Sequence, residues 1–291
     1  MKRVLISIFC FCLFSLSLNC QPAETSPKVT VPIQITDNRP FVEVMIKDKI
    51  FYFVVDTGGF NLIDLDAAKS LDLKLTEQTQ TGGTGEETVD TWTTKLDSFF
   101  IGERNFKKWK FYVLSIKNIK EGLKLPYLDG VIGYDLFRNS IIQIDYPKKT
   151  FSILPSFEGK NGIPFTLFGS HIPKIKVEID GIESEFILDT GDRSQLTLSK
   201  KFSQKLIEQN KYQLSEEKIT GHGIGGPIQA KTFDLKSLKF GNVSEENVLT
   251  RVPTLTRGAF AEDNFYGSIG SGILKKYRVT IDYRKRLIYF D

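Results

Sequence analysis

Residues 51–58 read FYFVVDTG, an apolar run that leads directly into Asp-Thr-Gly. Upstream, Val42, Val44 and Ile46 recur at every second position, and a polar turn at residues 47–49 separates the two runs. Alternation with a period of two is typical of a half-buried strand, and two strands joined by a short polar turn form a hairpin. The stretch therefore predicts a β-hairpin whose second strand ends in a tight turn at residues 56–58.

The same arrangement returns 133 residues later. Ile175, Val177 and Ile179 alternate, a turn follows at residues 180–181, and Phe-Ile-Leu then leads into Asp-Thr-Gly at residues 189–191. In both copies the three alternating residues lie 14, 12 and 10 positions before the aspartate. Equal registers followed by the same tripeptide indicate an internal duplication.

A second repeated segment closes each half of the chain. Residues 129–133 (DGVIG) and 142–146 (IQIDY) correspond to residues 267–270 (GSIG) and 279–283 (VTIDY). We therefore expect an N-terminal lobe over residues 31–154 and a C-terminal lobe over residues 155–291, each about the size of a small domain. The class is mostly β, with short helices predicted at residues 64–71 and 199–210.

The first 30 residues read as a leader and a tether. Lys2 and Arg3 precede an apolar run that is too short to cross a bilayer comfortably, so residues 1–19 predict a secretion signal. The end of the run resembles a bacterial lipoprotein signal, although Ser17 and Asn19 depart from its usual pattern. That resemblance implies lipidation of Cys20 and an exported cell-envelope lipoprotein, facing the periplasm or displayed on the surface; plain secretion is the alternative. Residues 20–30 are small and polar, as in a flexible tether.

The composition excludes several classes of function. With 41% hydrophobic and 25% charged residues, the chain is an ordinary globular protein. The body after Cys20 contains no cysteine, which excludes a disulfide or a thiol nucleophile. Removal of the leader leaves 37 basic against 35 acidic side chains, so we expect no nucleic-acid partner. Because the two histidines, His171 and His222, lie far apart, we expect no metal site and no cofactor.

Taken together, the two Asp-Thr-Gly turns and the sequences Ile132-Gly133 and Ile269-Gly270 resemble aspartic proteases of the pepsin and retropepsin type. The resemblance is to bacterial single-chain forms and covers residues 31–291. It implies two β-barrel lobes related by a pseudo-twofold axis, with Asp56 and Asp189 meeting at a cleft that takes a peptide or protein substrate. Two close carboxyl groups cannot both ionise cheaply, so they share one proton and together activate a water molecule.

The resemblance also implies supporting roles for residues around the pair. The residues expected to hold the two catalytic turns through hydrogen bonds and close backbone approach are Thr57, Gly58, Thr190 and Gly191. A neighbouring strand is expected to pass beneath each turn at Gly133 and Gly270. Mobile flaps over the cleft are expected at Gly82, Gly83, Gly221 and Gly223, where two ordinary loops are the alternative.

The chain departs from the family pattern after each tripeptide. Gly59 and Asp192 stand where the family usually has Ala, Ser or Thr. Gly59 loses at most a hydroxyl contact. Asp192 would add a third negative charge and raise the proton affinity of the pair, unless it points outward or pairs with Arg193. The alternative function is accordingly a protease-fold module that binds peptides or envelope components without turnover.

Two further expectations concern assembly and the repeated Asp-Tyr pairs. Because duplication supplies both aspartates from one chain, we expect a monomer.

Asp145-Tyr146 and Asp282-Tyr283 end a strand in each half, and we expect structural roles for them at the edge of a terminal strand.

Overall fold

The computed structural model describes residues 28–262 and 264–291. The predicted signal at residues 1–19 and the predicted lipidation site Cys20 lie outside the described residues. Among the helices that are described, none is long and apolar enough to cross a membrane.

The N-terminal half forms an eight-stranded sheet with the order β2-β3-β4-β9-β5-β8-β7-β6. Its strands are β2 (Gln34–Thr36), β3 (Arg39–Ile46), β4 (Lys49–Val55), β5 (Leu62–Asp64), β6 (Thr76–Thr81), β7 (Val89–Ile101), β8 (Arg104–Leu114) and β9 (Gly130–Ile132). The predicted hairpin is β3–β4, with Val42 opposite Phe53 and Val44 opposite Phe51. A further pairing of β3 with β7 curls the sheet back onto itself.

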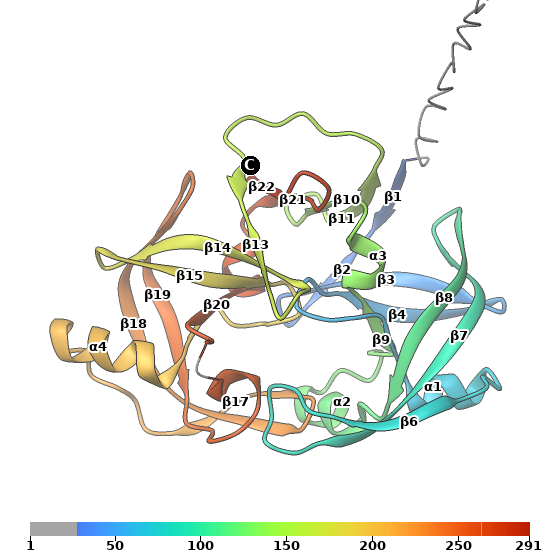
Figure 1. Ribbon diagram of the computed structural model, residues 1–291, viewed down its shortest axis with the longest axis horizontal. Helices are drawn as coiled ribbons and strands as arrows, with labels where there is room; N and C mark the ends of the chain where they lie inside the picture. Colours follow the sequence, from blue (N-terminus) through green and yellow to red (C-terminus); the bar gives the residue numbers. More distant parts are fainter. Residues whose placement is uncertain (1–27, 263) are drawn as a thin grey trace, which may run out of the picture.

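The C-terminal half repeats this topology strand for strand. Its order is β13-β14-β15-β20-β16-β19-β18-β17, and β14 also pairs with β18. The strands are β13 (Thr166–Phe168), β14 (Ile172–Ile179), β15 (Ile182–Asp189), β16 (Leu196–Leu198), β17 (Lys218–Gly223), β18 (Gly226–Phe240), β19 (Val243–Pro253) and β20 (Gly267–Gly270). The two halves lie side by side in Figure 1, with the N-terminal half in blue and green and the C-terminal half in yellow to red. The predicted fold, mostly β with two retropepsin-like lobes, is therefore confirmed.

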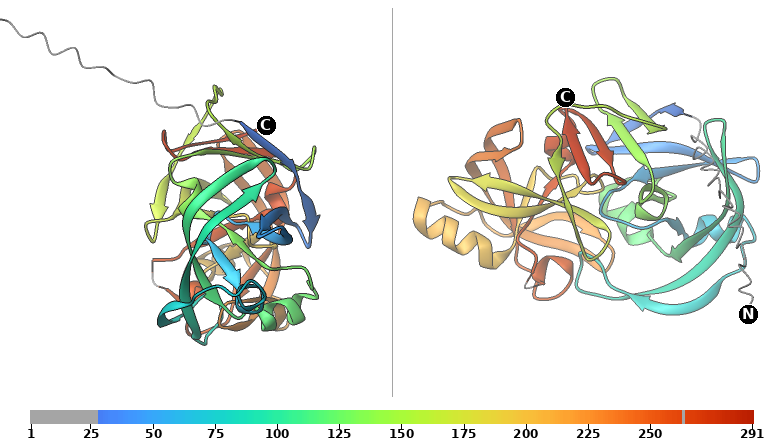
Figure 2. Two further views of the ribbon diagram at one scale, coloured as in Figure 1. Left: turned by 90° about the vertical axis from the view of Figure 1, so that its right-hand side faces the viewer. Right: turned by 45° about the horizontal axis from the view of Figure 1, so that its top comes forward.

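A six-stranded sheet joins the halves, with the order β1-β11-β10-β21-β22-β12. It consists of β1 (Val29–Pro32), β10 (Ile141–Asp145), β11 (Thr150–Leu154), β12 (Ile163–Pro164), β21 (Arg278–Asp282) and β22 (Leu287–Phe290). Figure 2 shows that strands from both ends of the chain, β1 in blue and β21 and β22 in red, belong to this sheet, and β11 and β10 lie between them. At its centre Gln143 pairs with Thr280, which occupies the same position in the other half, and the Gln143 amide donates to the Thr280 hydroxyl at 2.9 Å.

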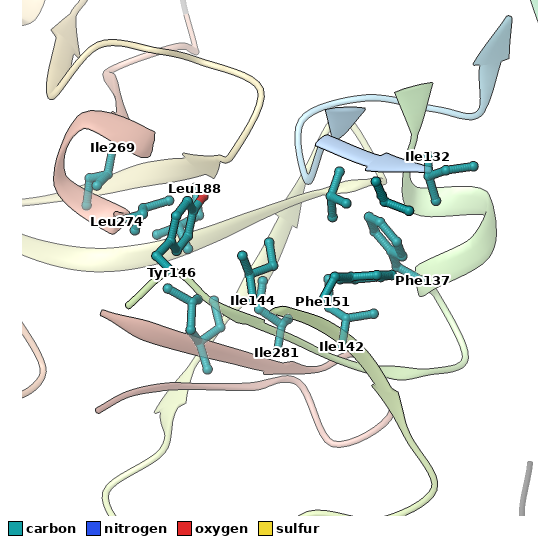
Figure 3. Close-up of a cluster of buried hydrophobic side chains, with 14 of the residues drawn as sticks. Ile132, Phe137, Ile142, Ile144, Tyr146, Phe151, Leu188, Ile269, Leu274 and Ile281 are labelled. Atoms are coloured by element: carbon teal, nitrogen blue, oxygen red, sulfur yellow. The ribbon is translucent and has the colours of Figure 1, made fainter. Parts of the chain in front are cut away.

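The core runs under both halves without interruption. Ile142, Ile144 and Ile281 point from the six-stranded sheet toward side chains of the two lobes (Figure 3). Phe137 and Ile132 meet them from the first half, and Leu188, Ile269 and Leu274 from the second. All are buried aliphatic or aromatic side chains, so the strand alternation seen in the sequence delivers one continuous apolar interior.

The helices are short, as expected from the sparse helical periodicity. They are α1 (Leu65–Ser70), α2 (Lys117–Leu123), α3 (Tyr134–Phe137), α4 (Lys200–Asn210), the 3-10 turn η1 (Ala259–Ala261) and α5 (Ser271–Leu274). The two predicted helices are α1 and α4. Ser199 caps α4, because its hydroxyl accepts the backbone N–H of Phe202 at 3.1 Å.

Candidate active site

Each Asp-Thr-Gly turn lies at the end of a strand that has a parallel neighbour. β4 runs beside β9, and the backbone N–H of Asp56 donates to the carbonyl of Ile132 at 3.0 Å. In the other half, Asp189 pairs with Gly270 of β20. A Cβ atom on Gly133 would lie 2.2 Å from the carbonyl oxygen of Gly59. One on Gly270 would lie 2.3 Å from the carbonyl oxygen of Ser194, so at both positions the close approach beneath the turn requires glycine.

The carboxyl groups of Asp56 and Asp189 meet where the two halves join. A Cβ atom on Gly58 would lie 2.7 Å from Cγ of Asp189, and one on Gly191 would lie 2.5 Å from Cγ of Asp56. Each carboxyl group is thus packed against the glycine of the opposite half, and the two carboxyl groups lie within hydrogen-bonding reach of each other. The structure brings together two residues that are 133 positions apart in the sequence.

Backbone N–H groups orient both carboxyl groups from below. Gly58 donates to Oδ1 of Asp56 at 2.7 Å, and Gly191 donates to Oδ1 of Asp189 at 2.9 Å. Asp189 receives a second bond, from the N–H of Asp192 at 3.0 Å. Amides that point at a carboxylate fix its orientation and support negative charge on it.

Thr57 and Thr190 connect the two turns. The hydroxyl of Thr57 donates to the carbonyl of Leu188 at 2.8 Å, and that of Thr190 donates to the carbonyl of Val55 at 2.7 Å. Each hydroxyl also accepts the backbone N–H of the other threonine, at 3.0 and 3.1 Å. Both side chains are fully buried, so these bonds form without competition from water.

The surroundings of the two carboxyl groups shift their pKa values to different extents. Burial and the negative charge of Asp192 raise the pKa of Asp56, while hydrogen bonds from Gly58 and Asp189 and the charge of Arg39 act in the opposite direction. The pKa of Asp189 is raised well above its ordinary value by burial and by the negative charges of Asp56 and Asp192. The pKa values of both carboxyl groups are therefore raised, so the pair holds a proton where an isolated aspartate would be ionised.

Asp192 does not pair with Arg193, the partner considered from the sequence. Its carboxylate accepts two bonds from Nη2 of Arg251, at 3.0 and 2.9 Å, and both side chains are buried. Arg193 instead contacts Asp37, with Nε 3.1 Å from Oδ1. Sequence reasoning missed Arg251 because it lies 59 residues downstream on β19, with no local motif to mark it.

A second basic residue near the pair was also missed. Arg39 is buried at the start of β3, and its Nε donates to the carbonyl of Gly191 at 2.6 Å. The adjacent turn residue Asn38 donates from Nδ2 to the carbonyl of Arg193 at 2.7 Å. This turn of the first half therefore holds the Asp-Thr-Gly loop of the second.

The repeated Asp-Tyr pairs lie at the ends of β10 and β21, which are the two central strands of the six-stranded sheet. The expectation of a terminal strand edge is therefore wrong. The hydroxyl groups of Tyr146 and Ser271 are 2.8 Å apart, and Ser271 Oγ donates to the carbonyl of Thr190 at 2.8 Å. Tyr146 of the first half thus supports the Asp-Thr-Gly turn of the second through Ser271.

The two glycine-rich stretches belong to long hairpins on the side of the molecule opposite the six-stranded sheet (Figure 1). Gly82 and Gly83 lie between β6 and β7, whereas Gly221 and Gly223 lie within β17, next to the turn at residues 224–225. The tips touch: the N–H of Gly85 donates to the carbonyl of Ile224 at 2.8 Å, and that of Glu87 to the carbonyl of Gly225 at 3.0 Å. Both hairpin tips therefore meet opposite the sheet that joins the halves.

The tip of the first hairpin also contacts the loop before η1. Oε1 of Glu86 accepts bonds from the N–H and the hydroxyl of Thr256, at 2.7 and 2.9 Å. Ala259 donates its N–H to the carbonyl of Gly83 at 2.9 Å. No group of three or more His, Cys, Asp or Glu side chains in the described part of the chain is arranged to hold a metal ion.

Comparison with known families bears on both halves. The sequence model of a family described as aspartyl protease matches the chain twice, over residues 42–136 and 175–271. Each match contains one Asp-Thr-Gly turn and the Ile-Gly element beneath it, and the two together cover more than half of the chain. No curated protein matches the chain.

Proposed function

Because the chain belongs to the aspartyl protease family, we propose that it is an aspartic endopeptidase with Asp56 and Asp189 as its catalytic pair. The observation that carries the proposal is the meeting of the two carboxyl groups, each packed against the glycine of the opposite half. Both side chains are partly exposed, so a water molecule and a substrate can reach them. The site draws one aspartate from each half of a single chain, which supports action as a monomer.

The pKa of Asp189 is raised well above its ordinary value, which supports Asp189 as the protonated member of the pair and Asp56 as the ionised one. Asp56, the ionised member, takes a proton from the water molecule as the water oxygen attacks the peptide carbonyl carbon. Asp189, the protonated member, gives its proton to the carbonyl oxygen, which yields a tetrahedral diol. When the C–N bond breaks, the leaving nitrogen takes the proton from Asp56. Asp189 regains a proton from a diol hydroxyl, and the starting state is restored.

The proposal extends to where the protein acts. The predicted leader and the single cysteine at its end support export and attachment to a membrane through a lipid on Cys20. A body without cysteine folds equally in an oxidising compartment. Incorporation of an alkyne-labelled fatty acid into the wild-type chain, and its loss in Cys20→Ala, would support the anchor. An unlabelled wild-type chain that is released from cells would contradict it.

Cleavage of a denatured protein substrate between pH 3 and pH 8, followed by mass spectrometry of the products, tests the activity. Asp56→Asn and Asp189→Asn should each lose cleavage by about 10³-fold or more, because neither retains both an ionised and a protonated carboxyl. Asp64→Asn is the matched control: Asp64 is a buried aspartate of the first half, paired with Lys120 at 3.0 Å and outside the catalytic pair. Wild-type cleavage rates in both active-site variants, with folding retained, would contradict the proposal.

A further inference from the structure

Asp192 and Arg251 form a sealed ion pair beside the catalytic turn of the second half. In addition to the two bonds from Arg251, the Asp192 carboxylate accepts the N–H of Ser194 at 2.9 Å and the hydroxyl of Thr197 at 3.2 Å. Arg251 donates from Nε to Thr197 at 2.7 Å, and its guanidinium carbon lies 5.3 Å from the centroid of the Phe260 ring. Every strong acceptor position of the carboxylate is thus used, so Asp192 is ionised in the folded protein. The charges of Arg251 and the bond from Ser194 lower the pKa of Asp192 below its ordinary value despite its burial.

The fold does not require this ion pair. Thr197 pairs with Arg251 and with Ser268, and the equivalent pairings in the first half join Leu62 to Tyr112 and to Val131. The same position of the same topology is therefore built there from uncharged side chains, and Gly59 stands in place of Asp192. Because burying an ion pair contributes little to stability compared with apolar packing, a sealed pair in only one half points to a function.

The pair is connected directly to the catalytic carboxyl of its own half. The N–H of Asp192 donates to Oδ1 of Asp189 at 3.0 Å, and the carbonyl of Asp192 accepts the N–H of Ser271 at 2.7 Å. The negative charge thus lies three residues from Asp189 on a turn that is held at both ends. The opposite charge near the site comes from Arg39, which forms an ion pair with Asp37 and whose charge lowers the pKa of Asp56.

We propose that Asp192, held ionised by Arg251, is a positioning residue that keeps the shared proton on Asp189 and leaves Asp56 as the base. The proposal rests on the catalytic pair of the proposed function. A fixed negative charge beside Asp189 disfavours its ionised form, whereas the guanidinium of Arg39 favours ionisation of Asp56. In this way the two equivalent aspartates, Asp56 and Asp189, carry different charges although the backbone around them is symmetrical.

The remaining titratable neighbours do not supply this asymmetry. Tyr146, which packs beneath the turn from the first half, is neutral because burial raises its pKa far above the physiological range. Tyr283 is buried near Asp56, and burial likewise raises its pKa. The charge of Asp192 raises the pKa of both members of the pair, but at Asp56 the charge of Arg39 acts against it, so Asp192 and Arg39 together distinguish the two carboxyl groups.

The test measures kcat/KM against pH in the wild type, in Asp192→Asn and in the double variant Asp192→Asn/Arg251→Gln. The alkaline limb of this profile is the fall in kcat/KM at high pH, where the pair loses its shared proton. Asp192→Asn removes the anion and leaves the cation, so the limb should move to lower pH by about one unit or more. The double variant removes both charges, and its limb should lie between those of the other two proteins. A purely structural role would lower the rate at every pH and leave the limb in place.

Asp64→Asn again serves as the control, because it breaks an ion pair of the first half whose carboxylate is buried. It should lower thermal stability without moving the limb. A readout without turnover is the carboxyl ¹³C titration of Asp189, whose midpoint should fall in Asp192→Asn and fall less in the double variant. Unchanged midpoints and limbs in both variants would overturn this proposal. A wild-type protein that cleaves nothing would instead overturn the proposed function, and the titration would still decide the role of Asp192.

Discussion

Thr57 and Thr190 make four hydrogen bonds across the junction of the two halves, two to each other and two to backbone carbonyls of the opposite half. Each hydroxyl donates to the carbonyl that precedes the other half's aspartate and accepts the N–H of the other threonine. The bonds thus control the relative position of the two carboxyl groups from directly beneath them. Because Thr57 and Thr190 are fully buried, a donor or acceptor that loses its partner in these bonds cannot bond to water instead.

Thr57→Val should therefore destabilise the protein strongly. The substitution keeps the shape of the side chain but leaves the Leu188 carbonyl and the Thr190 N–H without partners. We expect a loss of about 2–5 kcal/mol in the free energy of unfolding, as for two buried unsatisfied groups. Guanidinium unfolding curves measure it, and Thr57→Ser, which keeps the hydroxyl, should lose only about 1 kcal/mol. Equal stabilities for the two variants would refute the role of the bonds.

The two buried tyrosines should respond differently to loss of their hydroxyl groups. The hydroxyl of Tyr146 hydrogen-bonds to that of Ser271. The residue of the first half that corresponds to Ser271 is Tyr134, and the Tyr283 hydroxyl has no hydrogen-bond partner among the described residues. Tyr146→Phe should cost about 1 kcal/mol, whereas Tyr283→Phe should be neutral or stabilising by up to about 1 kcal/mol. Thermal unfolding of the two variants checks this. A Tyr283→Phe protein that is as destabilised as Tyr146→Phe would contradict the prediction.

Glu86 should act as an acid-sensitive clasp on the first hairpin tip. Its bonds from Thr256 lower its pKa, so the clasp is intact above the ordinary pKa of glutamate and is lost as the pH falls through the lowered value. Glu86→Gln should therefore speed amide hydrogen exchange at Gly85 and Ala259 by about two- to fivefold at neutral pH. The neighbouring exposed Glu87 provides the control, and Glu87→Gln should leave these rates unchanged. Equal exchange rates in the wild type and in Glu86→Gln would contradict this role of Glu86.

The sequence was sufficient to predict those parts of the fold that depend on local periodicity and on repetition. The hairpin registers follow from the two-residue alternation before Asp56 and Asp189, and both predicted helices are present. The duplication also explains why the two aspartates meet: two copies of one hairpin, joined around a pseudo-twofold axis, bring equivalent turns together. The glycines beneath the turns follow from the same symmetry.

What could not be predicted depends on contacts between distant segments. Arg251 reaches Asp192 only because β19 lies next to β16, and this adjacency follows from the closed sheet topology. The turn before Arg39 crosses to the opposite half, so its partner is invisible in any local window. The expectation that the Asp-Tyr pairs lie at a sheet edge is wrong because the six-stranded sheet draws strands from both halves. The sequence of one half does not show which of its strands become central in that sheet.

The contact of Gln143 with Thr280 bears on the origin of this arrangement. The central strands of the joining sheet face each other in self-complementary register, as strands do in an isologous homodimer. Two identical copies of one half could make the same strand contact without a covalent link. Fusion of the copies into a tandem chain frees each to change by itself. Features found once, such as the Asp192–Arg251 pair, are changes that a strictly symmetric dimer could not make in one subunit only.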